Sequence, residues 1–117
     1  MGLVEVSVFL ANPDSNLKIE VSALVDTGVT LTVLPRKVAN SLKILPKSKS
    51  SVMTAGGPVG IDISSAEIEI GGKKEIVRIA ISDIIDKVLI GVTTLEILGL
   101  SVDPVTGQLK ESMYLLY

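Results

Sequence analysis

The alternation of apolar and polar residues is the feature that most constrains how this chain folds. Valine occupies every second position from Val4 to Val8, and apolar residues occupy every second position from Ile19 to Val25. Successive side chains of a β-strand point to opposite faces, so each segment is predicted to be a strand with one buried face. Residues 12–16, between them, are Asn-Pro-Asp-Ser-Asn, a composition typical of turns. The N-terminal part of the chain is therefore predicted to be a β-hairpin.

The rest of the chain alternates less regularly but also favours strands. Extended segments are predicted at residues 31–34, 48–54, 59–70, 75–81, 88–90 and 112–117. A change of phase at residues 64–65 predicts a bend or bulge in the longest of them. Two short helices are predicted, one over residues 35–42 and one in which Thr93 and Glu96 have the spacing of a capping box and Gly99 ends the helix.

Length and composition narrow the class of protein. A chain of 117 residues fits one domain, and we expect residues 1–117 to form a single all-β domain. The sequence contains no Cys, His or Trp, which excludes a Ser-His-Asp triad, a Cys-His pair, disulfides and zinc sites built on His or Cys. A formal net charge of -2 argues against a nucleic-acid partner, since phosphate binding needs a basic face. An enzyme of this composition would work with carboxylates, lysines, hydroxyls or backbone groups.

The sequence also bears on location and cofactors. No segment has the roughly 20 consecutive apolar residues that a membrane span needs. The start, Met1 to Ser7, lacks the positive charge of a secretion signal. We therefore expect a cytoplasmic protein with no membrane partner, and we predict neither a metal nor another cofactor.

One motif is suited to chemistry. Asp26-Thr27-Gly28 directly follows the apolar strand segment Ala23-Leu24-Val25. A buried strand would hold the carboxylate on a rigid element, and Gly28 would allow a tight turn that brings backbone N–H groups close to it. A strand-ending turn with a solvated Asp26 is the plainer alternative.

Together with later segments, this motif resembles the retropepsin-like aspartic proteases, the single-domain relatives of pepsin, and most closely those of the cellular, prokaryotic type. The resemblance covers nearly the whole chain. It rests on Leu-Val-Asp-Thr-Gly at 24–28, Val-Leu-Ile-Gly at 88–91, Leu-Glu-Ile-Leu-Gly-Leu at 95–100 and Val-Asp-Pro at 102–104. It implies a closed pepsin-like β-barrel with one or two short helices, acting as a two-fold homodimer.

The resemblance also implies a mechanism. Asp26 would face its own copy across the dimer, with Thr27 and Gly28 supporting the loop. Two carboxylates held close together share one proton, so the ionised one can take a proton from water while the protonated one donates to the scissile carbonyl. The predicted function is that of an aspartic endopeptidase acting on extended polypeptides.

A flap and a substrate cleft are implied as well. Ala55, Gly56, Gly57 and Pro58 correspond to the flap, although alone they would indicate only a hairpin turn. Candidate pocket walls, each equally plausible as core, are Val29, Leu31, Val59, Ile61 and Ile90. Val29 stands where the family usually has Ala or Ser, which would narrow the floor of the cleft.

Two other functions remain open: a catalytically silent dimer that binds extended peptides in the same cleft, and a pure dimerisation scaffold. Outside the motif, Asp62 is expected to point to solvent. Asp83 and Asp86 have metal-like spacing, but a plain loop is preferred there. The apolar terminal segment 113–117 is expected to be covered in the dimer, with pairing inside its own subunit as the alternative.

Overall fold

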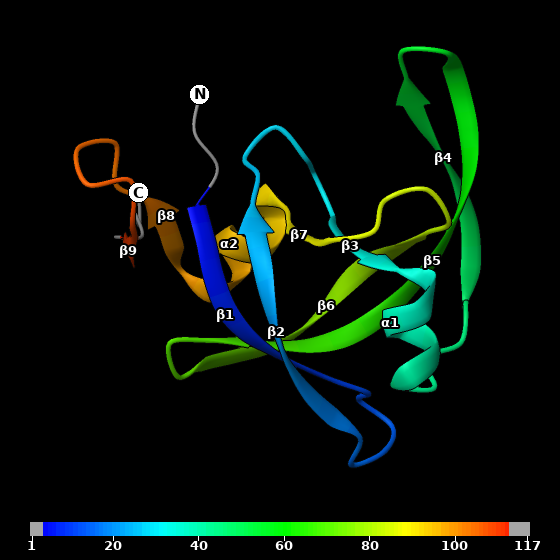
Figure 1. Cartoon of the computed structure of the whole chain (residues 1–117), viewed down its shortest axis with the longest axis horizontal. Coiled ribbons are helices and arrows are strands. Elements are labelled where there is room, and N and C mark those ends of the chain that lie inside the picture. Colours follow the sequence, from blue (N-terminus) through cyan, green and yellow to red (C-terminus); the bar gives the residue numbers. More distant parts are fainter. Residues whose placement is uncertain (1–3, 113–117) are drawn as a thin grey trace, which may run out of the picture.

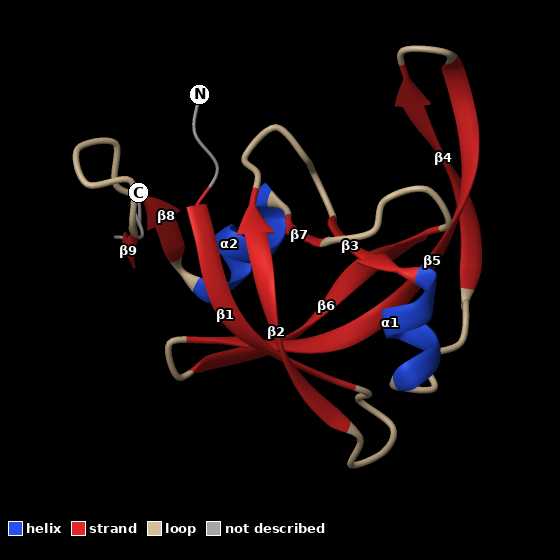
Figure 2. Ribbon diagram, in the orientation of Figure 1, coloured by secondary structure: helices blue, strands red, loops and turns tan. Residues whose placement is uncertain are grey.

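The computed structural model describes residues 4–112. Within that range the chain forms mostly strands, with two short helices (Figures 1 and 2). The elements in chain order are β1 (Val4–Ala11), β2 (Lys18–Val25), β3 (Thr32–Pro35), α1 (Arg36–Ser41), β4 (Ser48–Thr54), β5 (Gly57–Ile70), β6 (Lys73–Ser82), β7 (Val88–Ile90), α2 (Val92–Leu98), β8 (Leu100–Val102) and β9 (Leu109–Glu111).

Six of the strands close into a barrel. They are hydrogen-bonded in the order β1-β2-β7-β3-β6-β5, and β5 pairs again with β1, which completes the ring. β4 pairs only with β5 and extends away from the barrel, while β8 and β9 form a separate two-stranded sheet (Figure 1). The predicted all-β barrel with two short helices is thus confirmed.

The predicted N-terminal hairpin is also confirmed. β1 and β2 are antiparallel with Val4 opposite Val25 and Ala11 opposite Lys18. Val8 and Val25 are buried, whereas the polar residues that alternate with the apolar ones, such as Ser7 and Glu20, lie on the outside. The period of two in the sequence therefore marks the inner face of the barrel.

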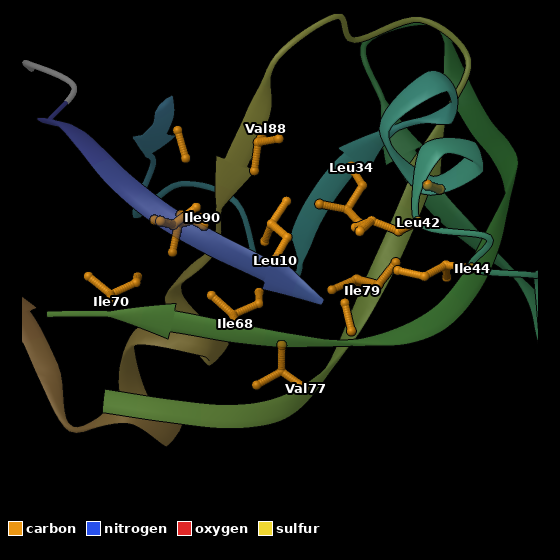
Figure 3. Packing of buried hydrophobic residues seen from close by; sticks show 14 of the residues in the cluster. Leu10, Leu34, Leu42, Ile44, Ile68, Ile70, Val77, Ile79, Val88 and Ile90 are labelled. Atoms are coloured by element: carbon orange, nitrogen blue, oxygen red, sulfur yellow. The ribbon is translucent and has the colours of Figure 1, made fainter. Parts of the chain in front are cut away.

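The interior is aliphatic and is filled from every strand of the ring. Leu10, Ile68, Ile79 and Ile90 are fully buried and point into the space between the strands (Figure 3). α1 covers one end of this core through Ala39, and the turn that follows adds the labelled side chains of Leu42 and Ile44. Close packing of branched aliphatic side chains holds the ring strands in register.

The structure has no bulge near residues 64–65, where the apolar residues of the sequence change phase. β5 pairs with β6 without interruption from Asp62 opposite Ile81 to Ile70 opposite Lys73, so no residue is inserted. The apolar residues change phase because the strand buries opposite faces along its length. Ile63 packs into a small second cluster, whereas Ala66 and those after it at every second position face the main core.

The ends of the helices and strands agree with the sequence-based predictions only in part. Gly99 ends α2 in the left-handed conformation, with φ of 70°, as predicted. The capping box is wrong: Gly91 is the N-cap, and no side chain caps the helix. Of the predicted strand 112–117, residues 113–117 lie outside the described residues, and Ser112 is not in a strand.

Candidate active site

Asp26 stands where two core strands stop running side by side. β2 and β7 are parallel, with Val25 opposite Ile90. The next amide along, that of Asp26, donates a hydrogen bond of 3.0 Å to the Ile90 carbonyl. Because Val25 and Ile90 are both buried, the half-buried Asp26 is attached directly to the rigid interior of the barrel.

The Asp-Thr-Gly sequence forms a tight turn around the carboxylate. The Gly28 amide donates to Asp26 Oδ1 at 3.0 Å, and the Val29 amide donates to the Asp26 carbonyl at 3.1 Å. Within residues 4–112, no other group donates a hydrogen bond to this carboxylate. Asp26 itself is half-buried, and Thr27 and Gly28, which follow it, are exposed.

The loop that follows Asp26 rests on the first turn of α2. The Val92 amide donates to the Val29 carbonyl at 2.8 Å, and the Thr93 amide donates to the Thr30 carbonyl at 3.1 Å. The Thr93 hydroxyl also donates to the Thr30 carbonyl. The first N–H groups of a helix have no partner inside it, and here the loop carbonyls supply one. Thr93 therefore binds the Asp26 loop instead of taking part in a capping box with Glu96.

A buried polar contact also holds the loop after Asp26 against the start of α2. The hydroxyls of Thr32 and Thr94 lie 2.6 Å apart, and the Gly91 amide donates to Thr32 Oγ1 at 3.1 Å. Both threonines are fully buried. The backbones approach so closely here that a Cβ on Gly91 would lie 2.5 Å from the Leu31 carbonyl carbon. Position 91 therefore has no room for a side chain.

The predicted flap is the tip of the β4–β5 hairpin. The tip residues Ala55 and Gly56 are exposed, and Gly57 has φ of 108°, which suits glycine. The Thr54 hydroxyl donates to the Gly57 carbonyl at 2.7 Å and ties the turn together. Pro58 lies opposite Met53 in the β4–β5 hairpin, and both are exposed.

The candidate pocket walls separate into three groups. Val29, Leu31 and Ile61 are half-buried and pack around the second cluster, with Leu89 beside them. Val59 is exposed on the hairpin. Ile90 is fully buried in the main core, so its side chain offers no surface to a cleft, and its role here is to accept the Asp26 amide.

A groove of about 530 Å³ lies between the hairpin and the loop after β6. The walls are mostly apolar, and the residues that line them are Val52, Thr54, Val59, Gly60, Ile61, Ile81, Ser82, Ile84 and Ile85. Four charged residues also line the groove: Arg36, Lys49, Asp62 and Asp83. A lining of this kind offers contact area to apolar groups of a ligand. Asp26 does not line this groove.

The charged residues of the groove form a network that the sequence did not reveal. Arg36 donates through Nε and Nη2 to the two oxygens of Asp83, at 2.8 and 3.0 Å, and lies 2.9 Å from Asp62. Lys49 donates to Asp62 at 3.0 Å. The expectation that Asp62 points to solvent is wrong, because its side chain is only 12% exposed.

These contacts shift the titration of the charged groups. Hydrogen bonds from Lys49 and Arg36 lower the pKa of Asp62, and the hydrogen bonds from Arg36 lower the pKa of Asp83. The carboxylates in turn raise the pKa of Arg36. Arg36, Asp62 and Asp83 are therefore charged at neutral and mildly acidic pH.

Among residues 4–112, no group of three or more His, Cys, Asp or Glu side chains is placed to hold a metal ion. In the same range, no helix has both the length and the apolar character needed to cross a bilayer.

Comparisons with known proteins agree with this geometry. The family model described as "Aspartyl protease" matches residues 12–106. Among solved structures, the protease of EIAV complexed with the inhibitor HBY-793 superimposes with a TM-score of 0.64 over 84% of this chain and 89% of that one. Its sequence is 23% identical, so the likeness describes the fold. A search of curated proteins gave no match.

Proposed function

Because this chain belongs to the aspartyl protease family and is an aspartic-type endopeptidase, we propose that it cleaves extended polypeptides as a homodimer, with Asp26 of each protomer forming the catalytic pair. The single observation that carries this assignment is the position of Asp26. Its amide donates to the core strand β7, one carboxylate oxygen accepts a hydrogen bond from the Gly28 amide, and the next two residues of the loop are exposed.

The chemistry requires a second carboxylate. Two carboxyl groups about 3 Å apart cannot both ionise, so the pair holds one proton. The ionised member removes a proton from a bound water, which then attacks the scissile carbonyl carbon. The protonated member donates its proton to the carbonyl oxygen. In this assignment the second carboxyl belongs to the partner subunit's Asp26.

The exposure of the acid loop supports a dimeric site. Thr27 and Gly28 are exposed in the isolated chain, although catalysis of this kind needs a site closed to bulk water. A second copy of the loop across a two-fold axis would cover these residues and supply the missing acid. The resemblance assigns to Thr27 the contact between the two loops.

The hairpin and its groove support an extended substrate. A peptide in β-conformation can pair with an exposed ribbon and place alternate side chains in pockets. We assign the flap role to Ala55, Gly56, Gly57 and Pro58, and we assign substrate contacts to the half-buried or exposed apolar residues of the cleft, which are Val29, Leu31, Val59 and Ile61.

The test is cleavage of a denatured protein substrate at acidic pH by the wild type, by Asp26→Asn and by Asp14→Asn. Asp14→Asn is the matched control, because it also removes one carboxyl group but does so at an exposed turn residue. We expect the wild type and Asp14→Asn to cleave equally and Asp26→Asn to lose cleavage. Equal cleavage by wild type and Asp26→Asn would refute the assignment. A wild type that binds an extended peptide without cleaving it would favour the silent peptide-binding dimer.

A further inference from the structure

The outer part of the β4–β5 hairpin has no strand partner in the barrel, and its apolar contact with the second cluster is made by Ile61, next to the base. β5 pairs with β6 from Asp62 onward, and the residues before Asp62 pair only with β4. Residues 48–61 thus project from the barrel as a two-stranded ribbon, in which Ser48 and Lys49 pair with Ile63 and Asp62 at the base (Figure 1). A two-stranded ribbon is only marginally stable by itself, so its position depends on what fixes its base.

Asp62 lies at that base and is bonded to a rigid part of the protein. It is the first residue of β5 paired with β6, opposite Ile81. Arg36, which binds it, is the first residue of α1 and follows β3 directly. β3 is buried and pairs with both β6 and β7, so Arg36 projects from the firm interior.

The same arginine holds the opposite wall of the groove. Pro35 lies opposite Ser82 in the parallel pairing of β3 with β6, which places Arg36 beside Asp83. Asp83 begins the loop to β7, where Ile84 is 86% exposed and Ile85 lines the groove beside it. Arg36 therefore joins the base of the ribbon to the loop that faces it.

We propose that Arg36 is a positioning residue that sets the width of the substrate groove by binding Asp62 at the base of the hairpin and Asp83 on the facing loop at once. The role suits arginine, because a planar guanidinium can bind one carboxylate through two N–H groups and still reach another. Lysine has a single ammonium and cannot hold both carboxylates in fixed directions.

This inference rests on the proposed function for its effect on catalysis. Among the residues that the structure describes, Arg36 forms its hydrogen bonds and ion pairs with Asp62 and Asp83 and none with Asp26 or the loop after it, so its loss should leave the chemical step alone. If the ribbon holds the binding-competent position only about a tenth of the time without Arg36, the apparent affinity for a peptide falls about tenfold. The expected signature is a KM raised about tenfold with kcat nearly unchanged.

The test compares wild type with Arg36→Met, Arg36→Lys and Lys73→Met. Lys73→Met is the matched control, since it breaks an ion pair with Glu111 that is not part of the groove. Amide hydrogen exchange across residues 48–61 is measured together with KM and kcat. We expect Arg36→Met to exchange several-fold faster in that segment alone and to show the raised KM, Arg36→Lys to recover only part of both effects, and Lys73→Met to match wild type.

Two results would overturn the inference. One is exchange of residues 48–61 in Arg36→Met that equals wild type. The other is a fall in kcat with an unchanged KM. If wild type cleaves nothing, the proposed function fails, and the exchange measurement alone then decides whether Arg36 positions the hairpin.

Discussion

Replacing Gly91 with alanine tests whether the Asp26 loop is seated on the start of α2. A Cβ atom at this position would lie 2.5 Å from the Leu31 carbonyl carbon and 2.6 Å from the Thr30 carbonyl oxygen. Carbon atoms in contact lie about 3.5–4.0 Å apart, so the new Cβ and the Leu31 carbonyl carbon must move apart by about 1 Å. Both atoms are backbone, so no side chain can rotate away, and the loop or the helix must move.

The cost follows from that displacement. Overpacking of a well-packed site destabilises by about 1–3 kcal/mol. For a chain of this length, that corresponds to a fall in the unfolding temperature of about 4–12 °C. The loop also carries Asp26, the proposed catalytic acid, and a misplacement of about 1 Å at a catalytic group can lower the rate about 100-fold. We therefore expect Gly91→Ala to lose both stability and most of kcat/KM.

The assay is thermal unfolding and peptide cleavage at equal protomer concentration. Gly60→Ala is the control, because no atom lies within 4 Å of the Cβ that it would add. Its stability should stay within about 0.5 kcal/mol of wild type. If Gly91→Ala unfolds at the same temperature as Gly60→Ala, the close packing of the Asp26 loop against the start of α2 is refuted.

Three further perturbations have defined outcomes. Thr32→Val leaves a buried amide and a buried hydroxyl without their partner, so urea unfolding should show a loss of about 1–3 kcal/mol, and an unchanged midpoint would contradict this. The pKa values of Asp62 and Asp83 are lowered on folding, so their contribution to stability is present above the ordinary value of 3.8 and is lost as the pH falls through the folded values. Arg36→Met should therefore lose less stability than wild type on acidification below 3.8, and identical profiles would count against the network. An inhibitor with a statine-like hydroxyl, which mimics the tetrahedral intermediate, should raise the unfolding temperature of wild type, and no shift at high excess would argue against a formed catalytic pair.

Local sequence patterns were enough to predict most strands and the acid turn. Alternation from Val4 to Val8 marks a face that is inside the barrel, and the glycine at 99 does end its helix in the left-handed conformation. Asp26 lies at the end of a buried strand because the apolar segment before it and the glycine after it dictate a strand followed by a tight turn. These features depend on neighbours within a few residues, which a sequence displays directly.

The features that the sequence did not predict depend on distant partners. Asp62 alternates with apolar residues as an exposed acid would, yet it is nearly buried because Arg36 and Lys49 approach from other elements. Thr93 has the spacing of a capping box, but the Thr30 carbonyl binds it instead. Which residues meet across the barrel is decided by strand order, and the periodicity of one segment carries no information about that order.

Subunit mixing tests most directly whether two Asp26 carboxylates form one catalytic pair. Wild-type chains are allowed to exchange with Asp26→Asn chains so that half of a constant total is mutant. A pair built from both protomers predicts that activity falls to about one quarter of the wild-type value, because only dimers with two wild-type chains are active. Activity of about one half would show that each chain works alone and would contradict the shared pair.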